Sequence, residues 1–205
     1  MALFTTTNFP INALIEDIDH GKIGLPELQR PFVWPNVNVR NLFDSLYRGY
    51  PAGFLLFWKT GAEGAVLKGI GAKNEQAVPE TAIVDGQQRL TSLYAVVKGT
   101  EVLRANFKKE RIRIAFSPLT ERFEVTDAAI LKDKSFIPDI SELWRPDTDL
   151  FGIANSYIEQ LSAVRELTAE QIKHAQTAIG RLHNLLSYQF VALTPVAPTL
   201  QSRCG

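Results

Sequence analysis

Apolar side chains recur every three or four positions in two early stretches, residues 11–18 and 39–47. This spacing places them on one face of an amphipathic helix. Gly21 and Gly49 follow the two stretches, where glycine commonly ends a helix. The pattern therefore predicts two helices before residue 50.

Strand-like patterns lie between and after these helices. Residues 54–58 form a continuous apolar and aromatic run, which predicts a buried strand with Trp58 in the core. Residues 111–116 alternate apolar and polar side chains, and residues 123–125 and 188–193 have the composition of further strands. Strands mixed with helices predict an α+β fold.

Helical signals dominate over residues 127–193. Apolar spacing and interrupting prolines predict three helices, over residues 128–132, 140–144 and 153–167. Thr168 and Gln171 form the capping-box pair of a last helix. We therefore expect a mixed domain over residues 8–126, a helical extension over 127–193 and an irregular tail over 194–205.

Composition limits the function classes. The chain has 205 residues, of which 22 are basic and 22 acidic, so its net charge gives no sign of a general nucleic-acid-binding surface. The single cysteine, Cys204, cannot form an internal disulfide. No apolar run reaches membrane-spanning length and the N-terminus lacks a signal-peptide pattern, so we expect a cytoplasmic protein that does not engage a membrane.

The most informative stretch is residues 83–93, Ile-Val-Asp-Gly-Gln-Gln-Arg-Leu-Thr-Ser-Leu. Two β-branched residues lead into Asp85-Gly86, and helical spacing begins after the polar run that follows. A strand, a sharp turn and a helix place backbone N–H groups and a helix dipole beside Arg89, which predicts an anion site. The alternative is an ordinary Asp-Gly turn.

A second motif, Leu-Pro-Glu-Leu-Gln-Arg-Pro-Phe-Val-Trp, occupies residues 25–34. Its prolines exclude a continuous helix and favour an extended loop. Arg30 between aromatic residues is suited to a planar ligand or a phosphate. In the alternative interpretation, Phe32 and Trp34 fill the core and Arg30 pairs with an acid.

Two further stretches are candidates for function. Residues 60–80 have little periodicity and predict a long loop, which could form a lid near the 83–93 motif. Residues 104–113 hold five cations and one acid, and are the best candidate for contact with a nucleic-acid backbone, although such runs are commonly solvated surface.

The motifs at 25–34 and 83–93, with Gly-Tyr-Pro-Ala-Gly-Phe-Leu-Leu-Phe-Trp at 49–58 between them, closely resemble the N-terminal domain of the GmrSD-type restriction endonucleases. The resemblance spans roughly residues 8 to 193. It implies a ParB/sulfiredoxin-like nucleotide-binding fold, and nucleotide hydrolysis coupled to restriction of modified phage DNA. Gly86 and Arg89 match the Gly-x-x-Arg turn of that fold.

The resemblance also implies roles for individual residues. Asp85, Gln87, Gln88 and Arg89 would be catalytic, and Asp85 would hold Mg²⁺. Gln29, Arg30, Gly86 and Arg89 would bind the nucleoside triphosphate. Arginines suit phosphate oxygens, glycine allows close backbone approach, and a carboxylate suits magnesium.

The family's C-terminal nuclease domain, with its His-Asn-His metal centre, has no counterpart in this sequence. The chain also stops soon after a strand, so we expect a truncated product of a longer protein. DNA is the expected partner, together with a nuclease partner or a second copy of the chain. Two alternatives stay open at this point: a DNA-binding module that does not hydrolyse nucleotide, and an inactive fragment.

Overall fold

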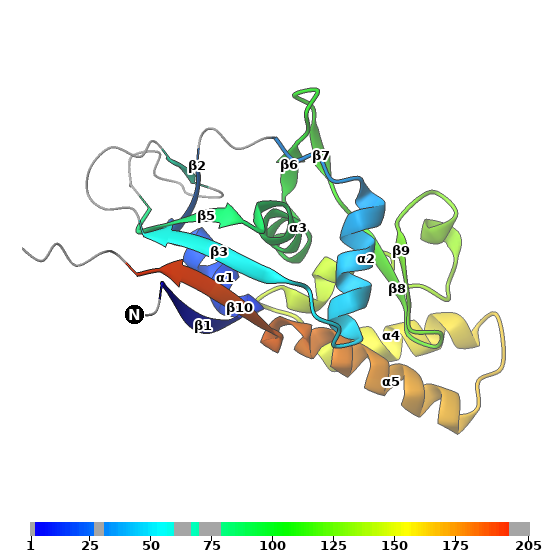
Figure 1. Cartoon of the computed structure of the whole chain (residues 1–205). Coiled ribbons are helices and arrows are strands. Elements are labelled where there is room, and N and C mark those ends of the chain that lie inside the picture. Colours follow the sequence, from blue (N-terminus) through cyan, green and yellow to red (C-terminus); the bar gives the residue numbers. More distant parts are fainter. Residues whose placement is uncertain (1–2, 27–30, 60–66, 70–78, 197–205) are drawn as a thin grey trace, which may run out of the picture. The chain divides into compact units, whose positions relative to one another are not determined.

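A computed structural model describes residues 3–26, 31–59, 67–69 and 79–196. The chain forms two compact units, each built from separate stretches: residues 1–29, 53–87 and 189–205 in the first, and 30–52 and 88–188 in the second. The described elements confirm the α+β class (Figure 1). The division into 8–126 and 127–193 stays a prediction.

The first unit contains a mixed six-stranded sheet. Its strands are β1 (Phe4–Pro10), β2 (Ile23–Pro26), β3 (Phe54–Lys59), β4 (Leu67–Gly69), β5 (Thr81–Asp85) and β10 (Gln189–Pro195). They lie in the order β1-β10-β3-β5-β2-β4. The pairs β10–β3 and β2–β5 are parallel, and the other neighbours are antiparallel.

Helix α1 (Ile11–Asp19) packs on one face of this sheet (Figure 1). Its apolar stripe is buried, as the spacing predicts, and Gly21 follows with a left-handed φ of 71°. Leu55 and Phe57 of β3 are buried, whereas Phe54 and Trp58 are 59% and 57% exposed. Placing Trp58 in the core was therefore wrong, because side chains alternate along β3 and only one set is buried.

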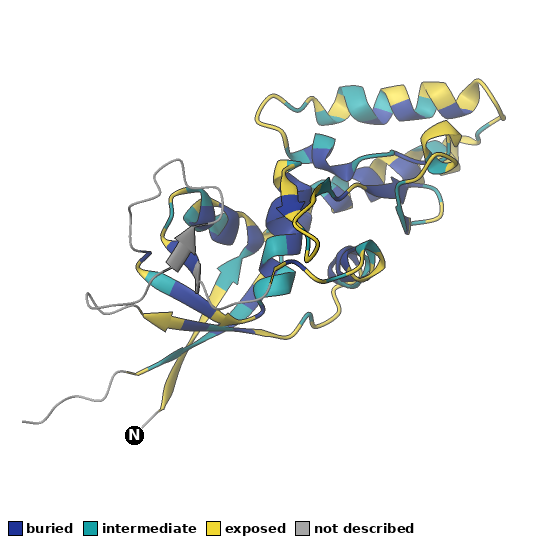
Figure 2. Cartoon of the chain, turned by 90° about the horizontal axis from the view of Figure 1, so that it is seen from above, coloured by how far each residue is buried: buried dark blue, intermediate teal, exposed yellow. Residues whose placement is uncertain are grey.

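The N-terminal strand β1 was not predicted. Its sequence, Phe-Thr-Thr-Thr-Asn-Phe-Pro, lacks apolar alternation and most of the strand is exposed (Figure 2). It forms because its backbone pairs along its whole length with β10. The final strand expected at 188–193 is confirmed as β10.

The second unit is mainly helical. Its elements are α2 (Asn36–Tyr47), α3 (Gln87–Lys98, counted from Gln88), β6 (Glu101–Leu103), β7 (Lys109–Arg111), β8 (Ile114–Ser117), β9 (Arg122–Val125), η1 (Ile130–Lys132), η2 (Ile140–Trp144), α4 (Leu150–Ser162), α5 (Ala169–His183) and η3 (Asn184–Ser187). The strands form two hairpins, β6–β7 and β8–β9. The capping box at Thr168 and Gln171 is confirmed.

An aromatic cluster forms part of the second unit's core. The rings of Tyr47, Phe116 and Phe123 lie 4.7 to 5.5 Å apart between centroids. The guanidinium of Arg181 lies 4.3 Å from the Tyr47 ring centroid, and burial raises the pKa of Tyr47 to about 12. This cluster joins α2 and α5 to the β8–β9 hairpin.

The single strand expected at 111–116 was wrong. β7 ends at Arg111 and β8 begins at Ile114, and each belongs to a different hairpin. Within the described ranges, no helix is long and apolar enough to cross a membrane.

Candidate functional site

The Asp-Gly-Gln-Gln-Arg motif lies where β5 ends and α3 begins. Asp85 is exposed at the end of β5, Gly86 is buried, and the helix starts at Gln87. Gly86 has a φ of 92°, which strongly favours glycine because it has no Cβ. The predicted strand, turn and helix are confirmed, and the helix start presents N–H groups with a partial positive charge.

The two units divide within this motif. Asp85, Gly86 and Gln87 belong to the first unit, whereas Gln88 and Arg89 belong to the second. In the first unit, Asp85 pairs with Leu56 of β3 next to a register shift. The exposed side chains of Phe54 and Trp58 lie two positions before and after Leu56 along β3, and Trp58 pairs with Ala82, three residues before Asp85.

Gln88 connects the two sequence motifs within the second unit. Its side-chain Oε1 accepts hydrogen bonds from the backbone N–H groups of Val33 (3.0 Å) and Trp34 (3.3 Å). These residues belong to the 25–34 motif, so Gln88 holds the end of that segment against α3. Sequence reasoning assigned Gln88 to the nucleotide and missed this contact.

Arg89 is partly buried. Its Nη1 donates a hydrogen bond to the carbonyl oxygen of Ala52 at 2.5 Å. The guanidinium is therefore held by the chain just before β3. A guanidinium carries five donors and a positive charge at neutral pH, which suits an anionic ligand.

Gln29 and Arg30 lie outside the described residues, as do 60–66 and 70–78 of the expected lid. The part of that stretch that is described, β4, pairs with β2. Phe32 is 5% exposed, which agrees with the core interpretation of this aromatic residue. Trp34 is half-buried.

Arg104 organises the segment that follows Arg30. Its guanidinium lies 4.9 Å from the Phe32 ring centroid and donates hydrogen bonds to the Trp34 carbonyl and to Asn36 Oδ1. Its Nε lies 2.8 Å from Glu110 Oε2. Hydrogen bonds from Arg104 and Asn36 hold the pKa of Glu110 below its usual range. These contacts occupy the guanidinium and give Arg104 a structural role.

The other four cations of residues 104–113 are of two kinds, one paired with an acid and three exposed. Arg111 Nη2 lies 2.7 Å from Asp139 Oδ2. Lys108, Lys109 and Arg113 are exposed. Only part of the cluster is therefore available to an anionic partner.

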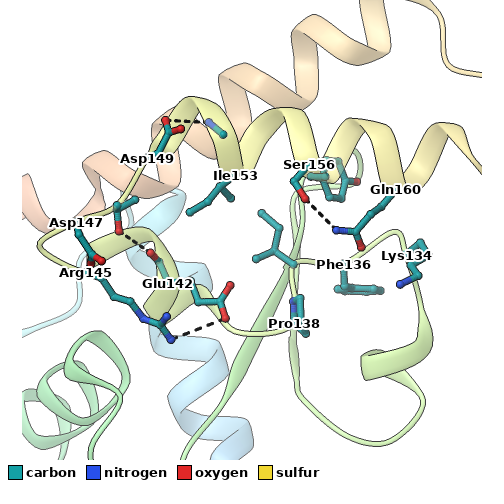
Figure 3. Close-up of a pocket in the computed structure, with 14 residues that line it drawn as sticks. Lys134, Phe136, Pro138, Glu142, Arg145, Asp147, Asp149, Ile153, Ser156 and Gln160 are labelled. Atoms are coloured by element: carbon teal, nitrogen blue, oxygen red, sulfur yellow. Dashed lines mark hydrogen bonds and ion pairs between the residues drawn. The ribbon is translucent and has the colours of Figure 1, made fainter.

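A cavity of about 430 Å³ lies within the second unit, and no described residue of the 25–34 or 83–93 motif lines it (Figure 3). Ile153, Phe136 and Pro138 form apolar walls, and Gln160 Nε2 donates a hydrogen bond to Ser156 Oγ at 3.1 Å. Its charged lining groups are Glu142, Asp147, Asp149, Lys134 and Arg145. Carboxylates outnumber cations there, which disfavours a polyphosphate ligand.

The described residues contain no group of three or more His, Cys, Asp or Glu side chains placed to hold a metal ion. Asp85 alone fits magnesium only where phosphate oxygens and water complete the shell, which is a common arrangement for this ion. The donor set is thus compatible with a metal that accompanies a nucleotide.

The model of the family "GmrSD restriction endonuclease, N-terminal domain" matches residues 11–196, which is most of the chain. The chain belongs to this family. The two motifs and the β5–α3 turn are therefore features of a GmrSD N-terminal domain, and membership links the chain to restriction systems.

A curated relative of this GmrSD N-terminal domain is the uncharacterized protein MJ0686 of Methanocaldococcus jannaschii. The two are 28% identical over 117 residues, which is 53% of this chain and 20% of the relative. The chain thus aligns with about a fifth of the length of that protein.

Proposed function

We propose that this GmrSD N-terminal domain binds a nucleoside triphosphate with Mg²⁺ at residues 85–89 and hydrolyses it as part of a restriction system directed at modified phage DNA. The supporting observation is the β5–Gly86–α3 turn, which combines a left-handed glycine, a helix start and an exposed carboxylate. Glycine-dependent turns into helix N-termini commonly bind phosphate.

Each motif residue receives a role in this proposal. Asp85 holds the magnesium ion, and Gly86 lets phosphate oxygens approach the backbone. Arg89 contributes positive charge, and Gln87 orients the attacking water. Bound magnesium would neutralise charge on the phosphates. Gln29 and Arg30 stay the predicted second wall.

Gln88 receives a positioning role. Its carbonyl oxygen already accepts two backbone N–H groups, which leaves only its amide nitrogen for a ligand. A direct catalytic role for Gln88 stays a prediction. DNA, a nuclease partner and a second copy of the chain are the proposed partners of the whole protein.

The exposed aromatic residues of β3, the strand that pairs with Asp85, are suited to contact with a nucleobase. We propose that the exposed rings of Phe54 and Trp58 provide the stacking surface for the base of the ligand. Nucleotide binding should therefore change tryptophan fluorescence in the wild type. The change should be much smaller in Trp58→Leu.

The test uses Asp85→Asn, which removes the charge at almost constant shape. We expect protection from thermal unfolding by one of the four ribonucleoside triphosphates with Mg²⁺, and hydrolysis of that nucleotide. Asp85→Asn should reduce hydrolysis at least about 100-fold, because metal positioning and charge neutralisation are lost.

Glu80→Gln is the matched control, since it removes an exposed carboxylate near the other end of β5. Its hydrolysis rate should equal that of the wild type. Full turnover in a folded Asp85→Asn variant would refute the assignment.

A further inference from the structure

Phe107 is an unusual residue at the tip of the β6–β7 hairpin. Its side chain is 83% exposed, and its φ of 61° lies in the left-handed region that a bulky residue rarely adopts. A polar residue or glycine would suit both the conformation and the solvent better. The position therefore carries an aromatic ring despite two local disadvantages.

The hairpin holds this ring on a defined backbone. The Phe107 N–H donates to the Arg104 carbonyl at 2.9 Å, and the Arg104 N–H donates to the Lys108 carbonyl at 2.9 Å. Asn106 Oδ1 accepts the Lys108 N–H at 3.0 Å. Through the Arg104 side chain, the same turn is fixed to Trp34 and Asn36.

The charge around the tip is positive. Lys108 and Lys109 follow Phe107, both are exposed, and within the described chain neither ammonium group pairs with a carboxylate. The nearby Glu110 is already paired with Arg104 and Asn36, so it does not neutralise these lysines. Leu103 pairs with Lys109 in the hairpin and is 45% exposed.

This arrangement matches the chemistry of a base stack between two phosphate strands. An aromatic ring at the end of a narrow ribbon can stack on or between bases, while adjacent lysines bind phosphates. In Figure 1 the β6–β7 hairpin projects beyond the helices of its own unit. A single ring with one half-exposed leucine is a small apolar area for a lipid surface, where binding strength scales with buried apolar area.

We propose that the β6–β7 hairpin is a DNA probe, in which Phe107 stacks on a nucleobase and Lys108 and Lys109 bind the flanking phosphates. This inference rests on the proposed role in DNA restriction, but it requires neither nucleotide binding nor hydrolysis. The proposed DNA contact is made by the hairpin and involves no residue of the Asp-Gly-Gln-Gln-Arg motif.

The experiment compares duplex and single-stranded DNA binding by the full chain. Phe107→Ala should weaken binding about 5- to 100-fold, the range for loss of one stacked base. The double variant Lys108→Ala/Lys109→Ala should flatten the dependence of log affinity on log salt by about two units for duplex DNA. Phe107→Trp should restore binding.

A fluorescent base analogue placed in the DNA reports stacking separately from affinity. At saturating protein, the wild type should change the fluorescence of 2-aminopurine, Phe107→Ala should not, and the lysine variant should. Phe151→Ala removes another exposed phenylalanine of the same unit, 72% exposed, and should leave binding unchanged. Lys132→Ala/Lys173→Ala is the matched charge control.

Unchanged DNA affinity in both Phe107→Ala and the lysine double variant would overturn the proposal. The proposal would also be overturned if Phe107→Ala lost binding to vesicles of phosphatidylcholine and phosphatidylserine while its affinity for DNA stayed intact. Phe107→Asn, which suits the left-handed backbone, checks that any loss is not a folding defect. Hydrolysis without DNA should be unaffected in Phe107→Ala, so failure here and failure of the nucleotide site are distinguishable.

Discussion

Replacing Gln88 tests whether this residue holds the two motifs together. In Gln88→Ala, the N–H groups of Val33 and Trp34 lose their common acceptor. Each hydrogen bond contributes about 0.5–1.5 kcal/mol, and alanine returns a few tenths through its helix propensity. The second unit should therefore lose about 1–2 kcal/mol of unfolding free energy.

Gln88→Glu, in contrast, should not lower the unfolding free energy. The carboxylate keeps an acceptor oxygen for both N–H groups, and a negative charge in the first turn of α3 is stabilised by about 0.3–1 kcal/mol. Its stability should equal or exceed that of the wild type. A residue needed only for its amide chemistry would not show this contrast.

Urea unfolding monitored by circular dichroism, with Gln176→Ala as an exposed helical control, measures both effects. The midpoint for thermal unfolding should fall by roughly 2–8 °C in Gln88→Ala. If Gln88→Ala lost less than about 0.3 kcal/mol of unfolding free energy, the structural role would be refuted, because leaving the N–H groups of Val33 and Trp34 without their acceptor should cost more than that.

Two further predictions concern the hairpins of the second unit. Phe107→Asn should raise the unfolding free energy by about 0.5–1 kcal/mol, because asparagine adopts a left-handed backbone more readily than phenylalanine and little burial is lost. Glu121→Asn, at a φ of 49°, should give no gain, because Glu121 also contacts Arg181 and His174. Urea titration checks both variants, and a destabilised Phe107→Asn would contradict the argument. Because the pKa of Glu110 is lowered in the folded state, its carboxylate contributes fully to the unfolding free energy at neutral pH, and this contribution is lost as the pH falls below about 4. The difference in unfolding free energy between wild type and Glu110→Gln should therefore shrink from pH 7 to pH 3. A constant difference would contradict this prediction.

Local patterns were sufficient where the local sequence determines the structure. The apolar stripes of α1 and α2, the stop at Gly49 and the capping box of α5 all follow from residues within one or two helical turns. The β5–Gly86–α3 turn was predictable for the same reason. Its left-handed glycine is a local requirement.

The errors arose from contacts between distant residues. β1 has no periodic signal of its own and depends on β10. Trp58 is exposed because β3 buries only alternate side chains. Arg104 looked like part of a basic surface, but its partners Trp34 and Asn36 lie about 70 residues earlier. No spacing rule connects such positions, and the same holds for Gln88 and Val33.

The pairing of β1 with β10 has a consequence for synthesis on the ribosome. Thr5 and Thr194 are hydrogen-bonded although 189 positions separate them. During synthesis, β1 must therefore remain unpaired until the residues of β10, up to about 190 positions later, have been added. Such long-range closure slows folding and leaves an unpaired edge exposed during translation. The polar threonines of β1 lower the tendency of the unpaired strand to aggregate before β10 is available.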